Sequence, residues 1–128
     1  MVNISVSYTT RTSRPNEIDG VDYNFVDVNK FQELSIQNKF LEKAKVFGNY
    51  YGTLKGPIED TLVQGKDYLF DIDWQGTEQV KQIMQLDIVP VFILPPSIND
   101  LEKRLKKREE KNKELVDQRM KMAKDEIN

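Results

Sequence analysis

The sequence predicts an α/β fold, with a parallel sheet and helices in the second half of the chain and a small β-rich insertion in the first half. After residue 57, apolar strand-like runs alternate with helical patterns, which is typical of βαβ units. Before that point, short segments of alternating apolar and polar residues are separated by turn residues, which indicates a small mixed sheet. The length of 128 residues is sufficient for one domain.

The first half is expected to contain three strands and one short helix. Apolar and polar side chains alternate in the predicted strands, at residues 4–8, 23–28 and 40–47. Residues 9–20 are polar, include Pro and Gly, and are expected to form a loop. Asn29 and Gln32 resemble a capping box at the start of the helix. Gly48 and Asn49 indicate a turn after the third strand.

The second half is expected to alternate strands with helices. A helix is predicted from Pro57 to Gly65, because Pro favours the first turn and Gly follows the last. Two apolar runs are typical of buried strands, at residues 68–72 and 88–94. Residues 77–85 show a helical pattern, and Ser97 with Asp100 caps the next helix. A helical pattern then continues to the end of the chain.

The composition excludes several classes of site. The chain contains no Cys, which excludes disulfides, thiolate catalysis and Cys-ligated metal centres. It contains no His, which removes the usual metal ligand and the usual general base near neutral pH. The net charge of −2 argues against a general nucleic-acid binder, and neither a signal peptide nor a membrane-spanning run is visible. We therefore expect a cytoplasmic protein whose chemistry rests on carboxylates, Arg, Lys, Tyr and hydroxyls.

Four residues of the first half are candidates for binding an anion: Arg11, Arg14, Tyr23 and Tyr51. The two arginines lie three residues apart in a polar loop, so they could hold one dianion from two sides through charge-assisted hydrogen bonds. The tyrosine hydroxyls could donate to the remaining oxygens. The alternative, from spacing alone, is that both arginines are solvated surface charges.

Two carboxylates, Asp71 and Asp73, stand at the end of a predicted apolar strand. Alternate residues of a strand share one face, and open α/β sheets bind ligands at the carboxyl ends of their strands. The pair could hold Mg²⁺ through water or accept hydrogen bonds from a ligand. The alternative is a polar strand end in solvent.

Three arginines in the last third of the chain, Arg104, Arg108 and Arg119, form another candidate group. Arg104 and Arg108 are four residues apart and share one helical face. Arginines on a mobile helical flap could neutralise a transferring phosphoryl group. The alternative is an ordinary charged helix, because Lys and Glu side chains surround them.

The motifs follow one another in a specific order along the chain. They are SVSYTTR (5–11), RP (14–15), GVDY (20–23), FLE (40–42), GNYYGT (48–53), DIDWQG (71–76), FILPPS (92–97) and RL (104–105). In this order and spacing, the chain resembles the guanylate kinases over essentially its whole length.

The resemblance implies a P-loop-kinase-like parallel-sheet core, a small mixed-β GMP-binding insertion and a helical lid. The core and lid would comprise residues 1–8 and 54–128, with the lid at about 97–120, and residues 9–53 would form the GMP-binding subdomain. The implied activity transfers the γ-phosphoryl group of ATP to GMP, giving ADP and GDP, with Mg²⁺ accompanying ATP. The implied partners are therefore these nucleotides, and neither nucleic acid nor a membrane.

The resemblance also implies roles for individual residues. The clamp on the GMP phosphate would consist of Arg11, Arg14, Tyr23 and Tyr51, with Glu17 beside it. The residues that bind guanine would be Ser7, Glu42, Thr53 and Asp73. Catalysis would involve Arg104, Arg108 and Arg119 from the lid side, and Asp71 near the reacting phosphates, in contact with Mg²⁺ only through water.

A carboxylate such as Glu42 would distinguish guanine from adenine. Guanine presents its N1–H and an exocyclic amine as donors on one edge, and a carboxylate accepts from both. Adenine has a bare N1 lone pair there, which a carboxylate repels. Because an unpaired buried polar group costs about 1–3 kcal/mol or more, this mismatch favours GMP over AMP.

The chain departs from the family pattern in ways that bear on its activity. An intact family member has a strand, a P-loop and a helix before the SVS segment, and a strand and helix after the lid. No Gly-x₄-Gly-Lys-Ser/Thr sequence occurs in these 128 residues, and Glu109-Glu110 replace a common Gly-Thr pair. We therefore expect the chain alone to bind GMP, to be weak or inactive as a kinase, and to self-associate through exposed core surface. The alternative function is a catalytically inactive guanylate-kinase-like module that binds phosphorylated peptides.

Overall fold

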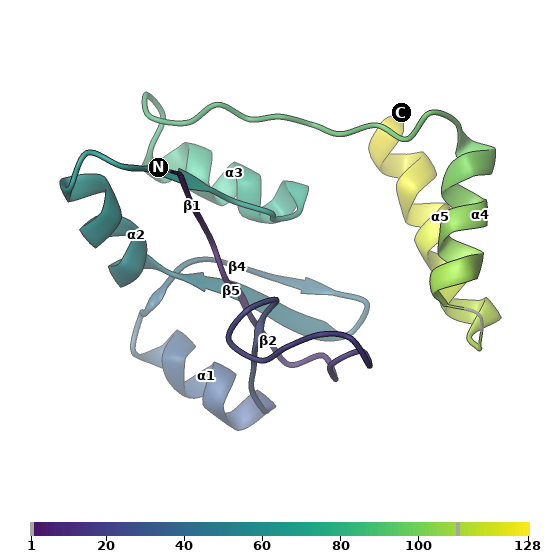
Figure 1. The fold of residues 1–128 in the computed structure, drawn as a ribbon, viewed down its shortest axis with the longest axis horizontal. Helices are drawn as coiled ribbons and strands as arrows, with labels where there is room; N and C mark the ends of the chain where they lie inside the picture. Colours follow the sequence, from purple (N-terminus) through teal and green to yellow (C-terminus); the bar gives the residue numbers. More distant parts are fainter. Residues whose placement is uncertain (1, 110) are drawn as a thin grey trace. The chain divides into compact units, whose positions relative to one another are not determined.

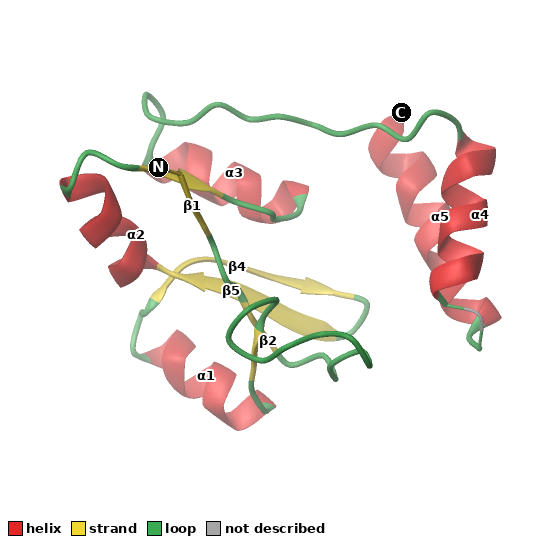
Figure 2. Ribbon diagram, in the orientation of Figure 1, coloured by secondary structure: helices red, strands yellow, loops and turns green. Residues whose placement is uncertain are grey.

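The computed structural model describes residues 2–109 and 111–128 (Figure 1). The chain divides into two compact units, one ending at Val89 and the other beginning at Pro90. The first unit is mixed α/β, and the second contains two helices (Figure 2). No helix in the described part of the chain is long and apolar enough to cross a membrane.

The first unit contains two sheets. β1 (Val2–Ile4) and β6 (Asp67–Leu69) form a parallel pair. The second sheet is mixed and has the strand order β3 (Asn24–Phe25), β2 (Tyr8–Thr9), β5 (Asn49–Leu54), β4 (Phe40–Val46). β2 runs parallel to β3 and antiparallel to β5, and β5 is antiparallel to β4. These sheets confirm the predicted α/β class with a parallel pair and a small mixed sheet.

A bulge in the β4–β5 hairpin directs three consecutive side chains to three different surroundings. Phe40 lies opposite Leu54 and Glu42 opposite Thr53, so Leu41 is the extra residue. The Phe40 ring stacks on Phe31 with centroids 4.5 Å apart, while Leu41 packs in the main core. Glu42 is left on the opposite face from Phe40, where it meets Thr53. The bulge therefore allows a buried carboxylate to follow two core residues.

The hairpin turn consists of two residues with positive φ. Phe47 has φ of 49° and Gly48 of 79°, and Val46 pairs with Asn49 across them. The predicted turn at Gly48 and Asn49 is therefore wrong by one residue, because a two-residue turn with both φ positive places Gly at its second position.

Three helices cover the sheets of the first unit: α1 (Val28–Ile36), α2 (Lys55–Val63) and α3 (Trp74–Ile83). The predicted capping box at Asn29 is wrong, because Asp27 is the N-cap and accepts from the Lys30 backbone N–H. α2 begins two residues before Pro57, so Pro57 still lies in the first turn. Backbone N–H groups of the first turn have no acceptor within the helix, so the lack of an N–H on Pro57 costs no hydrogen bond. α3 begins three residues earlier than predicted, because the Asp73 side chain caps it.

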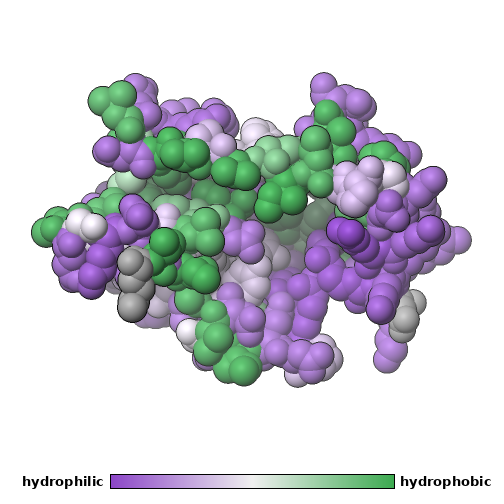
Figure 3. All heavy atoms as spheres, turned by 45° about the horizontal axis from the view of Figure 1, so that its top comes forward, coloured by the Kyte–Doolittle hydropathy of each residue, from purple (hydrophilic) through white to green (hydrophobic). Residues whose placement is uncertain are grey.

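The predicted strand at residues 88–94 is not formed. Figure 2 shows the whole segment between α3 and the next helix as loop. Ile88 packs against the main core, but the apolar side chains after it are exposed, Val89 by 89% and Ile93 by 86%. Apolar atoms reach the surface in several places (Figure 3). A strand needs a neighbour for its backbone N–H and C=O groups, and no described strand pairs with this segment.

The other predicted strands are formed over shorter ranges. β1 and β2 occupy the two ends of the range predicted as one strand, and residues 5–7 between them are irregular. β3 and β6 are likewise shorter than predicted. Strand pairing in these segments covers only two or three residues each, which a periodicity along one segment does not report.

The main core of the first unit lies between the β4–β5 hairpin, α2 and α3. Leu41, Ile58 and Val80 form its buried centre, with Tyr68 and Phe70 packed against it. The second unit has its own core where α4 (Ile98–Arg108) packs on α5 (Lys113–Ile127), centred on three residues: Leu105, Val116 and Met120. The predicted cap is confirmed, since Ser97 Oγ accepts from the Asp100 N–H at 3.0 Å.

Candidate functional site

The loop between β2 and β3 gathers two arginines around one carboxylate. Arg11 donates to both oxygens of Glu17 in a fork, at 2.8 and 3.0 Å. Arg14 donates to the same carboxylate through its backbone N–H at 2.8 Å and through its guanidinium at 3.3 Å. The hydrogen bonds from Arg11 lower the pKa of Glu17 to about 2, so the group stays ionised at every physiological pH. Both arginine side chains are therefore ordered by a negative charge.

Two tyrosines stand beside this arginine pair. The Arg11 guanidinium lies over the Tyr23 ring at 5.3 Å and near the Phe25 ring at 5.9 Å. Tyr23 and Tyr51 meet edge to face with centroids 6.1 Å apart. The hydrogen bond to Glu17 is the main cause of the raised pKa of Arg11, and Tyr51 adds to it. The structure thus brings together all four residues of the predicted clamp.

Three buried side chains form a hydrogen-bonded relay on the hairpin. Thr53 Oγ1 donates to Glu42 Oε1 at 2.6 Å, and the Ser7 and Thr53 hydroxyls are 3.2 Å apart. Since Thr53 gives its single proton to Glu42, Ser7 is the donor in the second bond. All three residues are at least nine-tenths buried. Burial raises the pKa of Glu42, and the hydrogen bond from Thr53 opposes that rise.

The first turn of α3 closes over the Glu42 carboxylate. A Cβ atom placed on Gly76 would lie 2.5 Å from Glu42 Oε2, so only glycine allows this close approach. Asp73 caps the same helix, accepting from the Gly76 N–H at 2.9 Å and from the Gln75 side chain at 3.0 Å. The negative charge of Asp73 adds to the raised pKa of Glu42, which shows that the two carboxyl groups are neighbours.

Asp71 lies in the loop between β6 and α3 and is exposed. Burial is the main cause of the raised pKa of Tyr23, and the charge of Asp71 adds a smaller contribution. Among the described residues, no group of three or more acidic side chains could hold a metal ion. A single carboxylate such as Asp71 would hold a divalent ion only together with water and ligand phosphates.

The remaining predicted residues belong to the second unit. Arg104 and Arg108 lie on α4, and Arg119 lies on α5. Glu109 brings two of them together, with Oε1 at 3.5 Å from Arg108 Nε and 3.9 Å from an Arg119 Nη atom. The helical hairpin therefore gathers Arg108 and Arg119 at its turn, while Arg104 is exposed one turn earlier.

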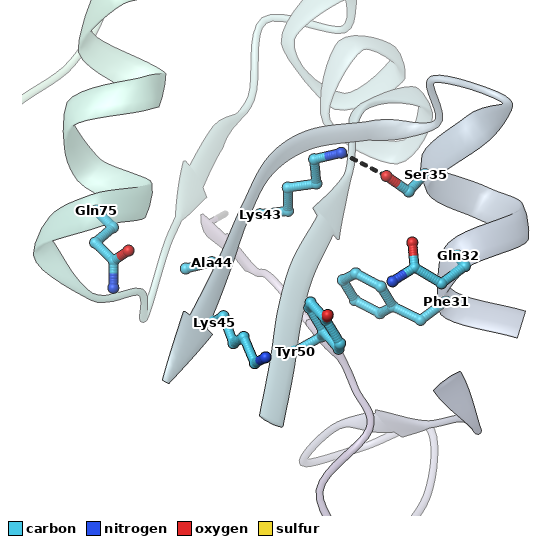
Figure 4. A pocket seen from close by; sticks show the side chains of 8 residues that line it. All are labelled: Phe31, Gln32, Ser35, Lys43, Ala44, Lys45, Tyr50 and Gln75. Carbon is cyan, nitrogen blue, oxygen red and sulfur yellow. Dashed lines mark hydrogen bonds between the residues drawn. The ribbon is translucent and has the colours of Figure 1, made fainter. Parts of the chain in front are cut away.

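A hollow of about 230 Å³ lies along β4 and is lined by residues of α1 and of the hairpin and by Gln75 of α3 (Figure 4). Its floor is formed by the stacked rings of Phe31 and Tyr50, and Lys43 reaches across to Ser35. None of the predicted site residues lines it. Among its hairpin residues, Lys43, Lys45 and Tyr50 alternate with Glu42, Tyr51 and Thr53 and face away from them, whereas Ala44 shares the face of Glu42.

Comparison with known proteins assigns the family. A family model for guanylate kinase matches residues 1–128. The guanylate kinase of Paramagnetospirillum magneticum is 52% identical over 126 residues, which cover 98% of this chain and 59% of that protein. The chain belongs to the guanylate kinase family. The guanylate kinase of Shewanella oneidensis shows the same identity, over 98% of this chain and 60% of its own length.

A solved guanylate kinase has a similar fold. The crystal structure of guanylate kinase from Anaplasma phagocytophilum matches with a TM-score of 0.78 and 41% identity, over 80% of this chain and 55% of that one. This likeness confirms the fold expected from the family resemblance. The chain spans about three fifths of the length of the curated guanylate kinases that it matches.

In this guanylate kinase family member, three further residues contact the predicted site residues and were not assigned from the sequence. Gly76 was part of a quoted motif, and its close approach to Glu42 depends on folding. Phe25 lies next to the Arg11 guanidinium. Thr12 accepts from Arg11 through its carbonyl at 2.8 Å. An aromatic residue two positions after Tyr23 was the one available signal, since alternate strand residues share a face.

Proposed function

We propose that this chain binds GMP as the phosphate acceptor of a guanylate kinase reaction, in which the γ-phosphoryl group of ATP is transferred to GMP. The single observation that carries the proposal is the buried relay of Glu42, Thr53 and Ser7. A buried carboxylate with hydroxyl partners is costly to maintain without a ligand that donates to it. Guanine offers two such donors on one edge.

The two ends of the proposed site have a separation that suits a nucleotide. Tyr51 and Thr53 are two residues apart on β5, so they share one face at a distance of about 7 Å. The base would bind at Thr53 and Glu42, with Ser7 and Asp73 beside them. The phosphate would bind at Tyr51, Tyr23 and the two arginines. One small ligand can therefore contact both ends at once.

Glu42 would supply the specificity for guanine. A carboxylate has about four acceptor positions, so Glu42 can accept from Thr53 and still accept from the N1–H and the amine of guanine. The hydroxyl of Ser7 can turn to donate to O6. Adenine would leave the carboxylate unpaired, which disfavours AMP by about 1–3 kcal/mol or more. Binding a phosphorylated peptide does not require this buried relay, so nothing in the site favours the alternative function of a phosphopeptide-binding module.

Phosphoryl transfer would rest on positioning and charge neutralisation. Asp71 would hold Mg²⁺ through water beside the reacting phosphates, and Arg104, Arg108 and Arg119 would neutralise the charge of the transferring group. Mg²⁺ would supply neutralisation of the ATP phosphates. Because no P-loop sequence occurs in these 128 residues, we expect GMP binding by this chain without turnover in the usual range of about 1–100 s⁻¹. A cytoplasmic location and self-association stay predictions.

Calorimetric titration with GMP and AMP tests the proposal. The parent chain is expected to bind GMP and to discriminate against AMP by at least about tenfold. Glu42→Gln replaces one acceptor oxygen by an amide that donates, so this discrimination should be largely lost. Glu59→Gln, on the exposed side of α2, is the matched control and should behave as the parent does. Equal binding of GMP and AMP by the parent, or unchanged discrimination in Glu42→Gln, would contradict the proposal.

A further inference from the structure

The Glu17 carboxylate has all its acceptor positions occupied. Oε1 accepts from Arg11 and Arg14 guanidinium nitrogens at 2.8 and 3.3 Å, and Oε2 accepts from Arg11 at 3.0 Å and from the Arg14 backbone N–H at 2.8 Å. A carboxylate offers about four such positions. Its negative charge would also repel a phosphate. Glu17 is therefore poorly suited to contact the ligand itself.

The arginines around Glu17 would be hard to position without it. They belong to the segment between β2 and β3, which has almost no regular backbone pairing. Two guanidinium groups also repel each other, and each has many rotamers to lose. Glu17 opposes both effects, because one carboxylate contacts both side chains and also fixes the loop backbone at Arg14.

We propose that Glu17 is a positioning residue that holds the guanidinium groups of Arg11 and Arg14 together before the phosphate of the ligand arrives. This inference rests on the proposed function. The contacts with Glu17 and Thr12 use three of the five N–H groups of Arg11, and the remaining two, on the side of the Tyr23 and Tyr51 hydroxyls, would donate to a phosphate. Prior ordering increases affinity because less rotamer freedom is lost on binding.

In the opposite role, the Glu17 carboxylate would occupy the position of the phosphate, and the ligand would have to displace Glu17. Electrostatics alone favours that role, because the two arginines carry a charge of +2 without Glu17 and a net +1 with it. The bond from the Arg14 backbone favours positioning, because it ties Glu17 to the loop that carries the arginines. The two roles predict opposite signs when the carboxylate is removed.

The test compares the binding of GMP and guanosine by calorimetry, because the ratio of their dissociation constants measures the contribution of the phosphate. In Glu17→Gln this phosphate contribution should fall at least about tenfold, while guanosine binds as in the parent. Glu17→Asp keeps the charge but is one methylene shorter, so its phosphate contribution should lie between those of the parent and of Glu17→Gln. Glu33→Gln, on the exposed side of α1, is the matched control.

Several outcomes would overturn the inference. A larger phosphate contribution in Glu17→Gln would show that Glu17 competes with the phosphate. An unchanged contribution, or an equal weakening of GMP and guanosine with a lower melting temperature, would show a structural role only. If the parent binds GMP, these outcomes leave the proposed function intact. If the parent binds neither ligand, the proposed function fails and the inference fails with it. Should Glu17→Gln not fold, Glu17→Asp decides by the same ratio.

Discussion

Two carboxylates lie at the two ends of the proposed site, and their surroundings differ. Glu17 is surrounded by N–H donors from two arginines, and its pKa falls to about 2. Glu42 is buried with a threonine hydroxyl as its hydrogen-bond donor, and its pKa is raised. The difference shows that the same side chain can be satisfied by the protein at one end and left with capacity for a ligand at the other. Chemical identity alone does not distinguish these roles.

The largest expected effect comes from removing the cation at the Glu17 end. Arg11→Ala leaves a partly buried carboxylate with one arginine, so the free energy of unfolding should fall by about 1–3 kcal/mol. GMP affinity should also fall at least about 100-fold, because charge-assisted hydrogen bonds contribute about 1.5–3 kcal/mol each. Urea unfolding and calorimetry measure the two effects.

Lys39→Ala removes an exposed cation of the same unit and is the control for Arg11→Ala. It should leave both the free energy of unfolding and the GMP affinity within error of the parent. If Arg11→Ala behaves like Lys39→Ala, the ion pair between Arg11 and Glu17 contributes neither to stability nor to GMP affinity. The proposed difference between Glu17 and Glu42 would then be wrong.

The second effect is a pH dependence of stability with opposite signs at the two carboxylates. The folded-state pKa of Glu17 lies below its ordinary value of 4.5, so its stabilisation, up to about 3 kcal/mol, is present above that pH and lost as pH falls toward 2. The folded-state pKa of Glu42 lies above 4.5, so its ionisation reduces stability as pH rises through the raised pKa. Urea unfolding between pH 3 and pH 7 measures both slopes.

Two variants separate these slopes. Glu17→Gln should be less stable than the parent at pH 7 and approach it at acid pH. Glu42→Gln should be as stable as the parent near pH 4 and at least as stable at pH 7. Parallel profiles for the parent and both variants would mean that the two carboxylates have similar environments.

The smallest effect is expected at Gly76, where a substitution would favour the helix but disturb the Glu42 carboxylate. Gly76→Ala improves helix propensity by about 1 kcal/mol, but its methyl group would displace the end of the Glu42 side chain. The melting temperature should therefore hold while GMP affinity falls about tenfold, or about 1.4 kcal/mol. Gly56→Ala in α2, where a Cβ meets nothing within 4 Å, should leave GMP affinity unchanged. Unchanged GMP affinity in Gly76→Ala would show that the position of the Glu42 carboxylate is not critical.

Local patterns predicted those parts of the fold that depend on local interactions. Ser97 and Asp100 cap α4 as expected, because a cap is made within one turn. The strand expected at residues 88–94 is absent, because a strand depends on a partner that its own apolar pattern does not reveal. The bulge at Leu41 was also invisible, since alternation from residue 40 to 47 predicts an uninterrupted strand.

The sequence named candidate site residues but not the contacts among them. Ten of the candidates belong to the first unit: Ser7, Arg11, Arg14, Glu17, Tyr23, Glu42, Tyr51, Thr53, Asp71 and Asp73. The fork between Arg11 and Glu17 and the direction of the Ser7 to Glu42 relay depend on side-chain geometry across distant segments. Spacing along the chain does not encode that geometry.

The most direct test of the account is to titrate the side-chain carboxyl carbons of Glu17 and Glu42 by NMR, with and without GMP. Without ligand, the pKa of Glu17 should lie near 2 and that of Glu42 above 4.5. Saturating GMP should lower the pKa of Glu42, because guanine donors favour the ionised form, and should leave the pKa of Glu17 well below 4.5. A Glu42 pKa that does not respond to GMP, or that responds equally to AMP, would contradict the assignment of Glu42 to guanine recognition.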